Sequence, residues 1–381
     1  MDDEAGAHGS GAARLQVTSR PSPPGRRWPP TAACHDSAPG RQDSVSGRPA
    51  DGSARPPRST YAALDLGTNN CRLLVARPTG ESFRVIDAFS RIIRLGEGVS
   101  TSGVLSEAAI ERAFDALGVC RDKMLNRGVT RARLIATEAC RAAANGADFL
   151  ARVRDNVGIE LEIVDRETEA LLAASGCTPL IDPRVSGVLV FDIGGGSSEL
   201  IRLGRPAPAT GGPPLPQVQT WVSLPVGVVT LAERYGGVKV DRALFETMVG
   251  DVRVHVDRFA SGQVTQPDMH MLGTSGTVTT ICGVHLGLKR YDRRQVDGCW
   301  MSANEVSGVV DQFLDMSYEE RAQNGCIGRE RADLVLAGCA ILEAIRRAFP
   351  SERLRIADRG LREGILMNMM REDQVWRRGP R

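Results

Sequence analysis

The chain has 381 residues, enough for two domains of ordinary size, and its 42% hydrophobic and 25% charged residues are typical of a globular protein. It carries 48 basic and 46 acidic residues, of which 8 and 6 lie in residues 1–59, so the rest of the chain holds 40 of each and is neutral. A neutral body argues against a nucleic-acid-binding protein, which needs a broad basic surface.

Cysteine, histidine and apolar patterns exclude further classes of protein. The nine cysteines lie far apart with no CxxC pair, and the five histidines form no HExxH motif, which argues against a disulfide framework, a zinc ribbon and a zincin. No apolar run reaches the ~18–20 residues of a membrane helix, and the N-terminus has no apolar signal core. We therefore expect a cytoplasmic protein with no membrane or nucleic-acid partner.

Order along the chain is expected to begin near Thr60. Residues 1–59 contain nine of the 21 prolines and seven of the 41 glycines, a composition typical of a disordered tail. The remaining chain divides into two predicted domains, residues 60–182 and 183–371, followed by a C-terminal tail at 372–381.

The first predicted domain opens with a β-hairpin. Residues 61–66 and 73–76 have strand character, and the turn between them is rich in Gly and Asn. The elements predicted next are strands at 83–89 and 92–95, a helix at 105–127 with Ser106 as its N-cap, a strand at 134–137, a helix that carries Arg141, a helix at 149–157, a strand at 161–164 and a helix that begins near Arg166.

The same layout returns in the second half. An apolar strand at 188–192 ends in Asp192, and a Gly-rich turn and a strand at 199–203 follow. Because both halves read as strand, Asp, Gly-rich turn and strand, the sequence indicates an internal duplication within an α/β fold. A loop at 204–217, a strand at 271–273 and a largely helical segment at 302–349 are predicted after it.

Three turns that follow apolar strands share small and hydroxyl residues. Their members are Gly67, Thr68 and Asn69, then Gly194, Gly195, Gly196, Ser197 and Ser198, then Gly273, Thr274, Ser275 and Gly276. One such turn is usually only structural, but three that converge would bind a phosphate chain through backbone N–H and hydroxyl groups. The Asp at a strand end would instead hold Mg²⁺, which prefers carboxylate, water and phosphate oxygens.

Two acids and one arginine allow either a structural or a chemical interpretation. Glu167 and Glu169 lie at a predicted helix start, where acids favour the helix dipole, but one of them could act as a general base on water. Arg141 lies either on a solvated helix face or near a phosphoryl group, which it would clamp. Spacing in the sequence does not decide between these alternatives.

Seven segments, in this order, resemble motifs of the exopolyphosphatase/guanosine pentaphosphate phosphohydrolase (Ppx/GppA) family. They are residues 63–69 with Arg72, 136–141, 167–170, 191–200, 224–227, 273–277 and 358–364. The resemblance covers about residues 60–371 and implies two actin-like (RNase H-like) domains that face each other across a cleft. It also implies a homodimer.

The family resemblance implies a Mg²⁺-dependent hydrolase that releases terminal orthophosphate from inorganic polyphosphate, from pppGpp, or from both. Glu169 aligns with the residue that activates water and Arg141 with the clamp. Asp65, Asp192 and Glu199 align with the metal and water network, and the Gly-rich turns with the phosphate loops. Arg91 and Arg94 fall in a segment near the cleft mouth.

Two other classes of protein, a kinase and a non-catalytic sensor, fit the sequence less well than an exopolyphosphatase. A kinase of the same fold usually has a longer acceptor segment and an Asp base, and a non-catalytic alarmone or nucleotide sensor would not need the set Glu169, Asp192, Glu199 and Arg141. We expect polyphosphate rather than pppGpp, because the sequence shows no groups that would read a guanine base. Longer family members continue into helical domains, so low processivity on long chains is expected.

Overall fold

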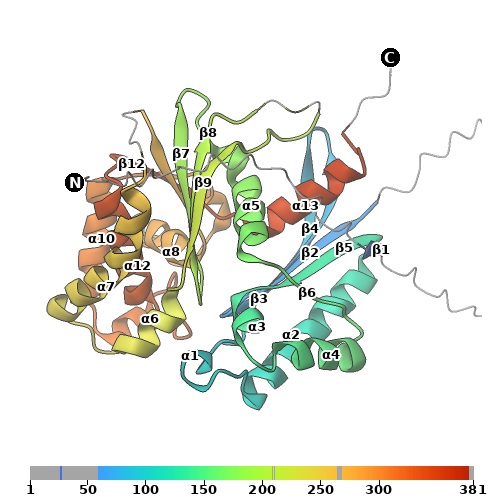
Figure 1. The fold of residues 1–381 in the computed structure, drawn as a ribbon, viewed down its shortest axis with the longest axis horizontal. Coiled ribbons are helices and arrows are strands. Elements are labelled where there is room, and N and C mark those ends of the chain that lie inside the picture. Colours follow the sequence, from blue (N-terminus) through green and yellow to red (C-terminus); the bar gives the residue numbers. More distant parts are fainter. Residues whose placement is uncertain (1–25, 28–58, 208, 210, 264–267, 377–381) are drawn as a thin grey trace, which may run out of the picture.

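The computed structural model describes residues 26–27, 59–207, 209, 211–263 and 268–376, and within them it contains two mixed six-stranded sheets flanked by helices (Figure 1). The first sheet consists of β1 (Arg26–Arg27), β2 (Tyr61–Leu66), β3 (Asn70–Thr79), β4 (Ser82–Ile92), β5 (Arg131–Ala136) and β6 (Glu162–Ile163). The second consists of β7 (Gly187–Ile193), β8 (Ser198–Gly204), β9 (Val218–Leu224), β10 (His270–Thr274), β11 (Trp300–Ser302) and β12 (Arg353–Ala357). The predicted α/β class is confirmed.

The helices begin where their capping residues predict. Ser106 accepts the N–H of Ala109 at the start of α2, and Asp165 accepts the N–H of Thr168 at the start of α5. The helices are α1 (Val99–Ser102), α2 (Glu107–Asn126), α3 (Glu138–Ala142), α4 (Gly146–Val157), α5 (Arg166–Cys177), α6 (Val228–Tyr235), α7 (Arg242–Ala260), α8 (Gly276–His285), α9 (Arg293–Val296), α10 (Ala303–Asp315), α11 (Tyr318–Gln323), α12 (Val335–Ala348) and α13 (Leu361–Glu372). In the described part of the chain, none of them is both long and apolar enough to span a bilayer.

Two local predictions change. The strand predicted at 92–95 is wrong, because β4 ends at Ile92 and the N–H groups of Ile93 and Arg94 both donate to the carbonyl of Asn69 instead of to a neighbouring strand. In the predicted tail, the two residues of β1 pair antiparallel with β5. The other residues of that tail, except Ser59, lie outside the described residues, as do 377–381 of the predicted C-terminal tail.

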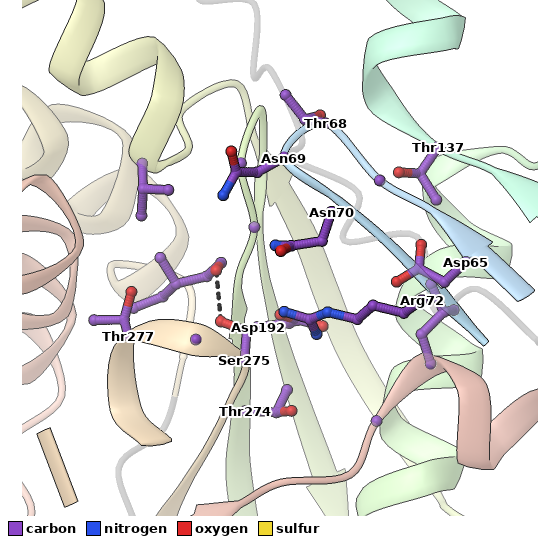
Figure 2. Close-up of a pocket in the computed structure, with 18 of the residues that line it drawn as sticks. Asp65, Thr68, Asn69, Asn70, Arg72, Thr137, Asp192, Thr274, Ser275 and Thr277 are labelled. Carbon is purple, nitrogen blue, oxygen red and sulfur yellow. Dashed lines mark hydrogen bonds between the residues drawn. The ribbon is translucent and has the colours of Figure 1, made fainter. Parts of the chain in front are cut away.

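Both sheets have the same strand pattern, as the repeated sequence layout predicts. β2 is parallel to β5 and antiparallel to β3, while β7 is parallel to β10 and antiparallel to β8. The two turns also close with the same bond, since Gly67 N–H donates to Asn70 O at 2.9 Å and Gly194 N–H donates to Ser197 O at 3.0 Å. The two halves therefore repeat one α/β layout, and residues of both turns line the same pocket (Figure 2).

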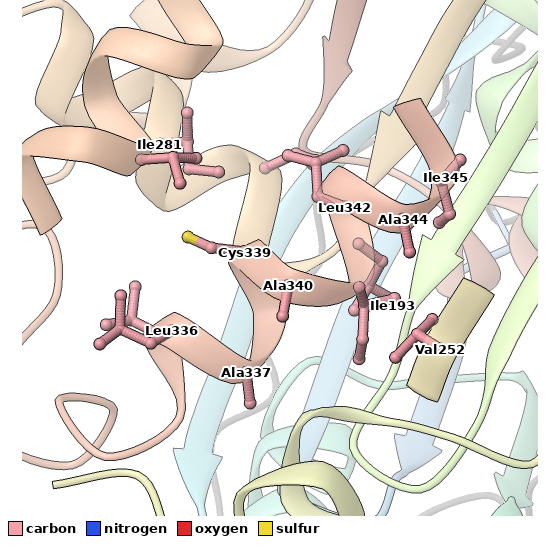
Figure 3. Packing of buried hydrophobic residues seen from close by; sticks show 14 of the residues in the cluster. Ile193, Val252, Ile281, Leu336, Ala337, Cys339, Ala340, Leu342, Ala344 and Ile345 are labelled. Atoms are coloured by element: carbon pink, nitrogen blue, oxygen red, sulfur yellow. The ribbon is translucent and has the colours of Figure 1, made fainter. Parts of the chain in front are cut away.

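Separate apolar cores stabilise the outer face of each sheet. Residues of β2, β3 and β5 pack against α2 and α4 in the first half. In the second half, α12 is buried along most of its length, and Leu336, Ala340 and Ile345 belong to the large cluster shown in Figure 3. Burial of this much apolar surface is the main source of stability for both halves.

Two helices, α5 and α13, lie between the sheets. The apolar residues of α13 pack on β2 and β3 of the first sheet, together with Leu172 of α5. The following turns of α5, at Ala174 and Cys177, pack on β7 and β8 of the second sheet. The predicted division at residues 182 and 183 stays a prediction, but α13 contacts the first sheet although it follows the second in sequence.

The α5–α13 contact depends on two glycines. A Cβ atom on Gly364 would lie 1.9 Å from the carbonyl oxygen of Leu172, and one on Gly176 would lie 1.9 Å from the carbonyl oxygen of Gly360. Distances this short exclude any side chain, so the backbones of the two helices meet directly.

We expect Gly364→Ala to destabilise the protein by about 2–3 kcal/mol, because the added methyl group must push α13 away from α5. The matched control is Gly118→Ala in α2, where an added Cβ meets no heavy atom within 4 Å. This control should stabilise the protein by about 0.5–1 kcal/mol through helix propensity. Thermal unfolding of both variants checks the prediction, and equal melting temperatures would contradict it.

Candidate active site

The cleft between the sheets is lined by the turns that the sequence singled out (Figure 2). The predicted phosphate-binding residues found in its lining are Gly67, Thr68, Asn69, Gly194, Gly195, Gly196, Ser197, Thr274, Ser275 and Gly276. They come from both halves of the chain. The structure thus brings together three turns that begin at Gly67, Gly194 and Gly273 and lie far apart in the sequence.

The first and second turns touch across the cleft. A Cβ atom on Gly195 would lie 2.8 Å from the Cβ of Thr68, and one on Gly196 would lie 2.9 Å from its hydroxyl oxygen. In the third turn, Ser275 has a φ of 84°, a conformation rare for a residue with a side chain, and its hydroxyl donates to the carbonyl of Ile193. Backbone strain of this kind is typical of functional sites.

Two predicted phosphate-binding residues lie outside the lining. The hydroxyl of Ser198 is buried and donates to the carbonyl of Val226 at 2.7 Å. Gly273 is buried inside β10, where a Cβ would lie 2.5 Å from the ring of Phe191. Both residues support the turns through packing and hydrogen bonds.

Among the acids that line the cleft are the four that the sequence singled out: Asp65, Asp192, Glu199 and Glu169. Asp65 lies opposite Arg72 in the first hairpin, and Asp192 lies opposite Glu199 in the second. Burial raises the pKa of Asp192 to about 6, and burial together with the charge of Asp192 raises the pKa of Glu199 to about 7. Glu199 is held by the hydroxyls of Ser197 and Ser223, which donate to its Oε1.

Glu169 and Glu167 differ in position although both lie in the first turn of α5. Glu169 lines the cleft, whereas Glu167 is exposed and is not part of the lining. Burial raises the pKa of Glu169, the neighbouring charge of Glu199 raises it further, and Arg141 acts in the opposite direction. Of the two candidate bases, Glu169 is the one with access to a molecule in the cleft.

Arg141 is bound to protein groups on every side. Its Nε donates to Glu138 at 3.0 Å, its Nη1 donates to the carbonyl of Val164, and its Nη2 contacts both Glu138 and Glu169, the latter at 3.2 Å. Arg141 is absent from the lining of the cleft. Its contact with Glu169 allows Arg141 to orient that carboxylate, and the clamp expected from the sequence stays a prediction.

Four arginines to which the sequence gave no role line the cleft. Arg359 is paired with Asp297, and the other three are Arg72 of β3, Arg331 just before α12 and Arg362 of α13. Within the described residues none of the three has a hydrogen bond or an ion pair, and burial lowers the pKa of Arg331 and of Arg362. A buried guanidinium without a carboxylate partner is costly unless an anion binds to it. The arrangement therefore indicates an anion site.

Arg362 owes its position to the turn that leads into α13. The Glu363 carboxylate accepts a hydrogen bond from the N–H of Gly360. Its Oε1 also accepts one from Nη2 of Arg293 at 2.7 Å. Tyr291 donates to Asp358 at 2.6 Å at the other end of the turn. A rigid turn holds the guanidinium of Arg362 in the cleft.

Two buried oxygens in the lining lack a donor. In the described part of the chain, Asn69 Oδ1 and Asn70 Oδ1 have no hydrogen-bond partner. Such atoms need a donor or a cation to offset their lost hydration. They add acceptor oxygens to the carboxylates at the end of the first hairpin.

A divalent cation would have to share its ligands with substrate or water. No group of three or more His, Cys, Asp or Glu side chains in the described ranges could hold a metal ion alone. Mg²⁺ commonly binds through one or two carboxylates and completes its shell with water and phosphate oxygens. Asp65, Asp192 and Glu199, with the two unpartnered amide oxygens, offer donors of that kind.

Sequence reasoning could have found one of the missed arginines. Arg72 stands opposite Asp65 just as Glu199 stands opposite Asp192, so the repeat marks it as an equivalent position. Nothing local marks Arg331, because it lies in an irregular segment between α11 and α12.

Comparisons with known proteins agree with this geometry. The model of the Ppx/GppA phosphatase family matches residues 74–373. A curated relative from Pseudoalteromonas translucida, named guanosine-5'-triphosphate,3'-diphosphate pyrophosphatase, is 26% identical over 329 residues, which are 84% of this chain and 61% of the relative. This chain therefore spans about three fifths of that protein's length.

Solved structures share the fold. The Ppx/GppA family member from Aquifex aeolicus is 27% identical and has a TM-score of 0.68, over 83% of this chain and 99% of that one. An exopolyphosphatase from Cytophaga hutchinsonii is 22% identical and has a TM-score of 0.73, over 82% of this chain and 98% of that one.

We expect Arg72→Gln to weaken the binding of inorganic tripolyphosphate about tenfold or more, because a charged hydrogen bond to the anion is lost. Calorimetric titration of the purified protein measures the change. The matched control is Arg91→Gln, since Arg91 is exposed, stacks on Phe89 and lies outside the lining. Equal affinities of the two variants would refute the anion site.

Proposed function

The chain belongs to the Ppx/GppA phosphatase family, and from this premise we propose that it is an exopolyphosphatase, which hydrolyses the terminal phosphoanhydride bond of inorganic polyphosphate. One observation carries the proposal. Three arginines line the same cleft as Glu169, a carboxylate that can act on water, and have no ion pair within the part of the chain that the structure describes: Arg72, Arg331 and Arg362. A phosphate chain would offset the charge of these arginines along its length.

In the proposed mechanism, Glu169 accepts a proton from a water molecule as the water oxygen attacks the terminal phosphorus. The bond to the bridging oxygen breaks, orthophosphate leaves, and the bridging oxygen stays with the shortened chain. Arg141 orients the Glu169 carboxylate through Nη2. The raised pKa of Glu169 makes it a stronger base once it is ionised.

In this mechanism the polyphosphate is bound by the backbone of the turns and by the arginines of the cleft. The small residues of the first and second turns allow the phosphate oxygens to approach backbone N–H groups. Arg72, Arg331 and Arg362 bind the charged oxygens of the polyphosphate.

We propose Mg²⁺ as the cofactor, which Asp192, Asp65 and Glu199 would hold together with oxygens of the substrate. The unpartnered oxygens of Asn69 and Asn70 and the mutual repulsion of the carboxylates support this choice. When bound, the ion supplies positive charge that offsets the phosphate oxygens.

The second candidate substrate is pppGpp, hydrolysed at its 5'-end to ppGpp. The name of the Pseudoalteromonas relative favours it. Polyphosphate is preferred because the described lining of the cleft contains no aromatic side chain on which a guanine could stack. Homodimerisation remains part of the proposal.

The direct test is phosphate release by the purified protein with Mg²⁺ on polyphosphate of several lengths, on pppGpp and on ATP. We expect polyphosphate to be cleaved fastest and EDTA to abolish the reaction, with recovery on adding excess Mg²⁺. Faster release from pppGpp would make the protein an alarmone phosphatase. Binding without release would support the non-catalytic sensor, and activity that survives EDTA would exclude the metal.

Glu169→Gln should lower kcat by about 10²–10⁴-fold while leaving the binding of tripolyphosphate in place, because an amide cannot take the proton from water. The matched control is Glu167→Gln, because Glu167 is exposed and lies in the same helical turn. Calorimetry and steady-state phosphate release separate the two properties. Full turnover by the Glu169 variant would mean that another residue is the base.

A further inference from the structure

We propose that Arg94 is a positioning residue that holds Arg331 in the cleft by joining the first half of the protein to the segment that carries Arg331. This inference rests on the proposed function, because it assigns Arg331 to the binding of the phosphate chain.

The side chain of Arg94 forms hydrogen bonds with residues before and after Arg331 in the sequence. Its Nη1 and Nη2 each donate to one carboxylate oxygen of Asp333 at 2.9 Å, and Nη2 also donates to the carbonyl of Glu330 at 3.0 Å. Asp333 and Glu330 flank Arg331 in the irregular segment before α12. A single guanidinium therefore binds the backbone before Arg331 and a side chain after it.

The other end of Arg94 is tied to the first phosphate turn. The N–H groups of Ile93 and Arg94 both donate to the carbonyl of Asn69. Arg112 of α2 donates to the carbonyls of Ile93 and Arg94 and so supports the same stretch from outside. The connection thus runs from Asn69, which lines the cleft in the first half, through Arg94 to Arg331, which lines it in the second.

The backbone of Arg94 is strained in a way that fits this role. Its φ is 46°, in the left-handed region that residues with side chains rarely adopt. Glycine would take this conformation without cost but would lack the side chain that reaches the other half. The strain is accepted where the guanidinium is needed.

The guanidinium of Arg331 lies at the third phosphate turn. A Cβ atom on Gly276 would lie 3.9 Å from Arg331 Nη1. Arg331 is assigned to binding, whereas Glu169 acts on water. Displacement of Arg331 should therefore weaken the binding of polyphosphate without slowing the chemical step. That outcome is a rise in KM with little change in kcat.

A second contact across the cleft provides a control. Glu233 of α6 accepts the N–H of Gly98 at 2.7 Å and the hydroxyl of Ser100 at 2.5 Å. These bonds also join the two halves, but they hold no residue of the cleft lining. Glu233→Gln therefore weakens the connection between the halves without releasing Arg331.

Stability alone does not explain the Arg94 ion pair. The side chains of Arg94 and Asp333 are 31% and 24% exposed, and ion pairs with that much water contribute little to folding. Arg94→Gln should consequently fold and melt like the natural protein. A drop in melting temperature as large as that expected for Gly364→Ala would contradict the proposal.

The experiment compares Arg94→Gln, Arg331→Gln, their double variant and Glu233→Gln in steady-state release of phosphate from tripolyphosphate. We expect Arg94→Gln and Arg331→Gln each to raise KM about tenfold with kcat within about twofold, and the double variant to match Arg331→Gln. The exchanged pair Arg94→Asp with Asp333→Arg should recover part of the loss, and Glu233→Gln should stay near the natural KM. Multiplied effects in the double variant would show that Arg94 acts independently of Arg331 and would overturn the proposal.

A second measurement does not depend on activity. Hydrogen–deuterium exchange of residues 328–334 in the protein without substrate should become faster in Arg94→Gln and stay unchanged in Glu233→Gln, because only the first variant loses the bonds to Glu330 and Asp333. Unchanged exchange in Arg94→Gln would overturn the positioning contact. Faster exchange in a protein that cleaves no phosphate anhydride would keep the contact and refute the proposed function.

Discussion

The crossing of α5 and α13 is the constraint on which the site depends. The two helices meet at Gly176 and Gly364 with their backbones in contact, and each helix carries cleft residues in its first turn. Glu169 comes from α5 and Arg362 comes from α13. The relative position of Glu169 and Arg362 is therefore set by a contact that excludes every side chain. At the same place the first sheet packs on α13 and the second sheet packs on α5.

The cleft concentrates charges of both signs that are unfavourable without a ligand. Burial and mutual repulsion raise the pKa values of Glu169, Asp192 and Glu199. Burial also lowers the pKa values of Arg331 and Arg362. A folded chain tolerates such an arrangement because the turns and helices around it are over-determined by packing. The stored cost favours a polyanion, and it also favours a cation beside it.

The duplicated fold gives the two halves different tasks. Asp65 and Asp192 occupy the same position of the repeat, but the residue opposite the first is Arg72 and the residue opposite the second is Glu199. One hairpin thus presents a cation and the other a second acid, although their backbones and turn hydrogen bonds agree. Contacts such as Arg94 with Asp333 then join the halves, so that groups from both act on one ligand.

The sequence by itself determined the class of fold, the repeat and the three Gly-rich turns, because apolar strands, capping residues and turn residues are local properties of the chain. It also pointed to Glu169 through a family resemblance. Only the tertiary structure decided that Arg141 holds Glu169, that Ser198 and Gly273 support the turns, and that Arg331 and Arg362 enter the cleft. These outcomes depend on which side chains meet between elements far apart in the sequence, and on which charged groups are buried. The local spacing of residues predicts neither.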